Sequence, residues 1–216
     1  MITEIVHQVI ILLGSILVLT LVYLAGSVIA LLACRIRIDE VNVFYGPAII
    51  SIKTPLGPVA VGCLPCGGSV SYDVQEFDRR PLLVRYMVIL SGVFAQLLVA
   101  GVCLGIGVAV SQFGSGFIQI AWGAVAPFAH GTPLVRAFFE RANESLFLGC
   151  GLCAAKLAAF NMLPIPPMSG GRLLTEIPRN RQQSVLWRWV NVIGALLIYA
   201  MVLTWLLALV NSWRHM

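Results

Sequence analysis

Four long apolar runs dominate the pattern of hydrophobic and polar positions along this chain. They lie at about Val9–Cys34, Tyr86–Val110, Leu146–Leu163 and Val190–Val210. A helix needs about 20 mostly apolar residues to cross the roughly 30 Å hydrocarbon layer of a bilayer. The runs therefore predict four transmembrane helices in a single membrane domain that covers residues 1–216.

Between the first two runs the pattern changes from helical to strand-like. Ile36–Tyr45 and Ala48–Lys53 are rich in β-branched residues, and the turn sequence Thr54-Pro-Leu-Gly-Pro58 precedes Val59–Cys63. This pattern predicts a small β element over about residues 36–70, in which Val43–Lys53 pairs with Val59–Cys63 in antiparallel fashion.

A shorter apolar stretch, Phe117–Phe128, contains Pro127 near its end. At that length an interfacial or re-entrant helix is favoured over a span. An amphipathic turn or two follows at Val135–Arg141. We therefore expect an interfacial segment over about residues 115–141.

Composition supports a membrane protein and gives an orientation. Of the 216 residues, 59% are hydrophobic and only 11% are charged, against about a quarter charged in a soluble domain. Ten of the Lys and Arg residues lie in the first and third loops: Arg35, Arg37, Lys53, Arg79, Arg80, Arg85, Arg172, Arg179, Arg181 and Arg188. Three lie on the opposite side of the predicted membrane: Arg136, Arg141 and Arg214. Cytoplasmic loops are enriched in basic residues, so these loops are expected in the cytoplasm with both termini outside. This placement accounts for the net charge of +5 without a nucleic-acid partner.

The most specific motif is Asn161-Met-Leu-Pro-Ile-Pro-Pro-Met-Ser-Gly-Gly171. Prolines remove backbone donors and break a helix, and paired glycines let the chain turn or pack closely. Unwound backbone at membrane depth is tolerated only where protein or water covers it. The motif therefore predicts an internal site; a plain helix end at the membrane surface is the alternative.

This motif resembles the site-2 protease signature Asn-x-x-Pro-x-Pro-x-Leu-Asp-Gly-Gly. Four further segments resemble that family in the same order: Ile36–Pro47, Leu64–Val70, Phe77–Arg85 and Asn191–Gly194. The resemblance covers about residues 20–210. It implies an all-α membrane protein with four transmembrane helices and a small membrane-associated β-hairpin element, in a bacterial cytoplasmic membrane.

The chain departs from the family at the zinc site. The family holds zinc with His-Glu-x-x-His on its first helix and an Asp in Leu-Asp-Gly. Counting back from Gly46-Pro47 without gaps places Tyr23 at the first His, Leu24 at the Glu and Ser27 at the second His. Ser169 replaces the Asp. From Gln8 to Cys34 there is no His, Asp or Glu. Catalytic zinc needs about three protein donors, so we expect no metal, no cofactor and no catalytic residues.

These departures predict a catalytically inactive, site-2-protease-like protein. The former substrate groove would bind a membrane protein or transmembrane peptide within the lipid bilayer, through residues inherited from the family's break: Asn161, Pro164, Pro166, Gly170, Gly171 and, in the preceding helix, Lys156. The strand at Ala48–Lys53 offers β-augmentation. The alternatives are a structural subunit of a membrane complex, or an intramembrane peptidase with non-zinc chemistry such as Ser27 or Ser169 with Lys156. The sequence leaves the oligomeric state open.

Two further features of the sequence carry candidate chemistry: Lys156 inside the third apolar run, and a pair of cysteines in the strand-like segment. A charge at membrane depth is costly, so the Lys156 amine is expected to meet carbonyls of the Asn161–Pro167 break, a hydroxyl of Tyr23, Ser27 or Ser169, or water. Its charge would then partly stand in for the missing metal, by holding together polar groups that zinc would otherwise organise. The pair Cys63 and Cys66 is a candidate for metal or redox chemistry.

Overall fold

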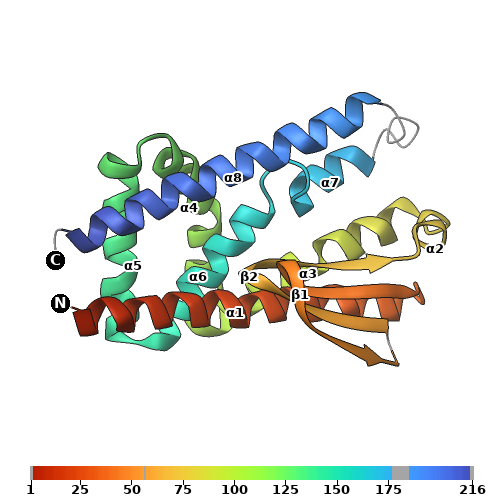
Figure 1. Cartoon of the computed structure of the whole chain (residues 1–216), viewed down its shortest axis with the longest axis horizontal. Coiled ribbons are helices and arrows are strands. Elements are labelled where there is room, and N and C mark those ends of the chain that lie inside the picture. Colours follow the sequence, from red (N-terminus) through yellow and green to blue (C-terminus); the bar gives the residue numbers. More distant parts are fainter. Residues whose placement is uncertain (1, 56, 177–184, 215–216) are drawn as a thin grey trace. The chain divides into compact units, whose positions relative to one another are not determined.

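The computed structural model describes residues 2–55, 57–176 and 185–214, and helices dominate it (Figure 1). The elements are α1 (Ile2–Ala33), β1 (Ile38–Thr54), β2 (Gly57–Tyr72), α2 (Val74–Asp78), α3 (Leu82–Leu104), α4 (Ile106–Val125), the π-helix η1 (Pro127–Gly131), α5 (Thr132–Glu144), α6 (Leu146–Asn161), α7 (Ser169–Glu176) and α8 (Val185–Arg214). The chain divides into two compact units, Leu12–Gln96 and a second made of Met1–Ile11 with Leu97–Met216.

Among the residues that the structure describes, four helices are long and apolar enough to cross a membrane. They are Thr3–Ala33, Leu82–Leu104, Ile106–Val125 and Arg188–Arg214. The predicted fold class, with four transmembrane helices and a small β element, is therefore confirmed. The predicted orientation and the single-domain assignment stay predictions.

The positions of the middle helices differ from those predicted. The run Tyr86–Val110 is not one helix, because α3 ends at Leu104 and Gly105 adopts a φ of +81° before α4 begins. Glycine reaches this left-handed region without a steric penalty, so one residue redirects the chain. The interfacial segment predicted over residues 115–141 is wrong in its first part, since α4 continues to Val125.

The predicted third span is also shorter than expected. The helix α6 has 16 residues, which at 1.5 Å per residue is about 24 Å long. That is less than the roughly 30 Å of a hydrocarbon layer. The helix ends at Asn161 because the proline-rich motif follows directly.

In the unit Leu12–Gln96, α1 and α3 approach each other through small residues. A Cβ added to Gly26 of α1 would lie 2.7 Å from the Cβ of Ala95 and 2.8 Å from the carbonyl oxygen of Ser91. The Gln96 side chain donates a hydrogen bond to the Leu19 carbonyl, 3.3 Å away. Small residues let membrane helices approach closely, and polar side chains then bond across the contact.

The long strands β1 and β2 pair as four short segments. Ala48–Thr54 forms an antiparallel hairpin with Gly57–Gly62, and the Thr54 hydroxyl donates to the Gly57 carbonyl at 2.6 Å. The first half of β1 pairs with Gly68–Tyr72. The predicted antiparallel pairing is confirmed for Ala48–Lys53.

The remainder of the predicted strand Val43–Lys53, before Ala48, pairs differently from the prediction. Val43 faces both Val61 and Gly68. Within the described residues, Ala48–Lys53 pairs on one side only, so it is an edge of the sheet. The side chains of Ile49, Ile50 and Ile52 on this edge are 68%, 54% and 57% exposed.

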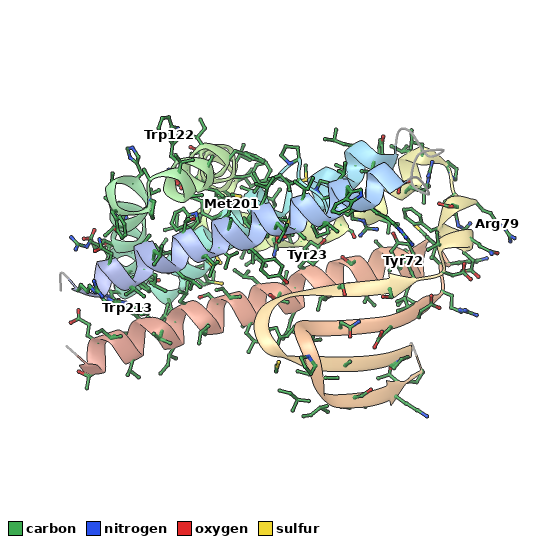
Figure 2. The ribbon with its side chains drawn as sticks, turned by 45° about the horizontal axis from the view of Figure 1, so that its top comes forward. Tyr23, Tyr72, Arg79, Trp122, Met201 and Trp213 are labelled. Atoms are coloured by element: carbon green, nitrogen blue, oxygen red, sulfur yellow. The ribbon has the colours of Figure 1, made fainter. Side chains whose placement is uncertain are left out.

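In the second unit, α8 runs across α4 and α5 (Figure 1). The Trp205 indole N–H of α8 donates to the Ile120 carbonyl of α4 at 3.2 Å, and its ring packs on Gly123. Met201, also on α8 (Figure 2), packs on a core that includes Ile120 and Ala159. Near the end of α8 the Trp213 indole donates to the Gln8 side chain at 3.0 Å.

The contact between Gly123 and Trp205 predicts a stability difference between two glycines of α4. Gly123→Ala would place a methyl group against the indole ring and lower the free energy of unfolding by about 1–3 kcal/mol. Gly114→Ala is the matched control, since an added Cβ there meets no atom within 4 Å. It should leave stability unchanged or raise it by up to about 1 kcal/mol through helix propensity. Thermal unfolding in detergent measures both, and equal effects would contradict the packing described.

Candidate functional site

The three α1 residues that the sequence comparison predicts at the family's zinc-motif positions pack against their own unit. The Tyr23 ring (Figure 2) covers Gly92 of α3, where an added Cβ would lie 2.5 Å from two ring carbons. Leu24 is buried and packs on Gly68 of β2. The Ser27 hydroxyl donates to the Tyr23 carbonyl at 3.1 Å. Side chains therefore fill the contacts from α1 to α3 and to the sheet.

The chemistry of these side chains does not match a zinc ligand set. Zinc is held by thiolate, imidazole or carboxylate groups. Leu24 has no donor atom, and the Ser27 hydroxyl bonds to its own helix. Among the residues that the structure describes, no group of three or more His, Cys, Asp and Glu could hold a metal.

The proline-rich motif forms a compact break between α6 and α7. Beyond Asn161 the amide of Leu163 still donates to the Phe160 carbonyl at 3.1 Å, and the Met168 amide donates to Ile165 at 2.9 Å. Pro164 is exposed and Pro166 is partly buried. Short turns thus satisfy backbone groups where the prolines supply no N–H.

The glycines of the motif are required by backbone contact. A Cβ on Gly170 would collide with the Met162 carbonyl, and one on Gly171 with the backbone of Ile165. Gly194 of α8 packs in the same way on the Pro166 carbonyl. Ser169, at the start of α7, is buried with 3% exposure. The break is therefore a tightly packed core element of its unit.

Lys156 bonds to α4 and not to the break. Its ammonium donates to the Gln112 carbonyl at 2.8 Å and to the Ser115 hydroxyl at 2.9 Å. The expectation that this amine needs carbonyl or hydroxyl partners is confirmed. The partners named from the sequence, in the Asn161–Pro167 break or at Tyr23, Ser27 and Ser169, were wrong, because α4 packs directly on α6.

The structure groups the predicted positions by unit. Tyr23, Leu24 and Ser27 belong to the unit Leu12–Gln96, whereas Lys156 and the break belong to the other. Sequence reasoning missed Gln112 and Ser115 of α4. Their signal is present, since Ser111, Gln112 and Ser115 are polar residues at helical spacing inside an apolar stretch.

Two groups of cysteines take different positions. Cys63 on β2 is an exposed free thiol, and the side chain of Cys66 lies outside the described part of the chain. Cys150 and Cys153 are partly buried free thiols on α6. Cys103 of α3 is hydrogen-bonded to Cys150 and packs beside Gly151. Cys103 and Cys150 therefore belong to the contact between α3 and α6.

The contact of Lys156 with Ser115 predicts a matched pair of serine variants. Ser115→Ala removes an acceptor from the ammonium and should lower the free energy of unfolding by about 0.5–2 kcal/mol. Ser111→Ala, at an exposed position of the same helix, should change it by less than about 0.5 kcal/mol. Chemical or thermal unfolding in detergent compares them. A larger loss from Ser111→Ala would show that Lys156 does not depend on Ser115.

Comparison with known families identifies the chain's relatives. The family model described as Peptidase family M50 matches residues 11–205, which includes most of α1, the sheet, the break and most of α8. A comparison with curated proteins gives no match. The four apolar helices and this match together identify an integral membrane protein. The chain therefore belongs to peptidase family M50, the site-2 protease family.

Proposed function

We propose that this chain is a non-catalytic member of peptidase family M50 that binds or regulates a membrane partner. The observation that carries this proposal is the packing of Tyr23, Leu24 and Ser27, whose side chains serve the contacts of α1 with α3 and β2. Ser169 completes the four positions with a hydroxyl in place of a carboxylate. Four such residues supply no zinc-bound water and no general base.

The partner-binding element that we propose is the edge strand Ala48–Lys53. It has an unpaired side within the described residues, and three exposed isoleucines lie along it. An extended partner segment could add to this edge through main-chain hydrogen bonds. In the other unit, the proposed partner-binding positions are those predicted from the sequence: Asn161, Pro164, Pro166, Gly170, Gly171 and Lys156.

A second candidate function rests on the 2.9 Å contact between Lys156 and Ser115. A lysine amine beside a serine hydroxyl is the nucleophile arrangement of Ser–Lys hydrolases. Here the Ser115 hydroxyl also donates to the Gln112 carbonyl at 3.2 Å. The Gln112 carbonyl also accepts a hydrogen bond from Lys156, so the contact of Lys156 with Ser115 can be explained as a structural cross-link between α6 and α4. A non-catalytic binding function is therefore favoured over the hydrolase.

Cleavage of a transmembrane peptide tests the proposal. The full chain in liposomes, with a peptide that an active family member cleaves, should give no cleavage with or without added zinc. An active member is the positive control. Cleavage that a chelator stops would contradict the absence of zinc chemistry. Cleavage that persists with chelator but stops in Ser115→Ala would establish the Ser–Lys alternative.

Photo-crosslinking tests the proposed edge strand. A photoreactive residue at Ser51, in the middle of the edge, should form adducts with a membrane protein in native membranes. The matched control is Ser71, an exposed serine in the segment of β2 that pairs with Glu40. Adducts of equal yield from both positions, or with lipid alone from Ser51, would rule out the edge as the binding element.

A further inference from the structure

Lys156 is a cation without an acidic partner in the described chain. Its two hydrogen bonds go to a backbone carbonyl and a hydroxyl, both neutral. The ion pairs seen, Arg37 with Asp39 and Arg141 with Glu144, lie elsewhere. Neutral oxygens lower the cost of placing an ammonium among apolar helices but leave its charge uncompensated.

The amine lies beside a face of α4 that a second helix can approach. Gly107, Ser111 and Gly114 follow one another at helical spacing and are all exposed. A Cβ added to Gly107 or to Gly114 would meet no atom within 4 Å. Small residues in such a row permit close helix contact in membranes. Ser115, which accepts from Lys156, directly follows Gly114.

We propose that this face of α4, with the Lys156 ammonium at its border, binds a partner's transmembrane helix that carries a carboxylate. The inference rests on the proposed function, because it gives the chemistry of the partner. An Asp or Glu in that helix would gain a charge-assisted hydrogen bond from the ammonium. Each charge relieves the cost of the other, so a helix with a carboxylate is selected over a neutral one.

Synthetic transmembrane peptides test this on the unmodified protein. Three peptides share one apolar sequence and carry Asp, Asn or Ala at the central position. The full chain is reconstituted in liposomes of zwitterionic lipid, and binding is followed by energy transfer between labelled protein and peptide. The Asp peptide should bind about tenfold more tightly than the other two, because only it forms an ion pair.

Variants assign the preference to the two parts of the surface. Lys156→Arg should keep the preference for Asp, and Lys156→Gln should remove it. Gly114→Leu should weaken binding of all three peptides by obstructing helix approach, without lowering thermal stability. Similar binding of the three peptides, or a preference that survives Lys156→Gln, would overturn the inference. So would loss of the preference on addition of anionic lipid, which would identify a lipid phosphate as the counter-ion.

The outcome is separable from that of the proposed function. Tight binding of the Asp peptide without cleavage supports both. Tight binding followed by cleavage supports the docking surface and overturns the non-catalytic function. Equal binding of all three peptides, with Ser51 adducts still formed, overturns only the docking surface.

Discussion

Close contact through glycine holds each unit of this protein together. Membrane helices gain little from burying apolar surface against one another, because lipid is as apolar as leucine. Packing at short range must therefore supply the attraction. Gly26 and Gly92 allow it between α1 and α3, and Gly116 and Gly123 allow it where α4 meets α6 and α8. Tyr23 and Leu24, which we predict at the zinc-motif positions of α1, take part in this packing.

The second constraint is that polar groups among apolar helices need partners. Gln96 bonds to the Leu19 carbonyl, and Lys156 bonds to the Gln112 carbonyl. The hydroxyl of Thr132 donates to the Ala208 carbonyl at 3.3 Å and accepts from Asn211 at 3.1 Å. Each bond joins two helices, so the polar residues fix which helices are neighbours. Lys156 is the member of this set whose charge these bonds do not balance.

Sequence reasoning succeeded where the signal is local. Long apolar runs indicate membrane helices whatever their neighbours, and β-branched residues around Thr54-Pro-Leu-Gly-Pro58 indicate the hairpin. It failed at Gly105, because hydropathy does not report a single backbone torsion. As a result, α4 was divided between a predicted span and an interfacial segment.

The candidate site shows the same division. The break at Asn161–Gly171 could be predicted because its prolines and glycines act within the segment itself. The partners of Lys156 could not, because Gln112 and Ser115 are more than 40 residues away in sequence. The contacts of Tyr23 with Gly92 and of Gly194 with Pro166 likewise depend on tertiary packing.

The central claim is that packing residues have taken the positions of a metal site. Elemental analysis of the protein, purified without chelator, measures this most directly when combined with an unfolding curve. We expect no stoichiometric zinc and an unfolding temperature that a chelator does not change. A metal that binds only the folded state would raise the unfolding temperature, and its removal by a chelator would lower it. One zinc per chain, removed by chelator together with a lower unfolding temperature and a lost activity, would contradict the claim.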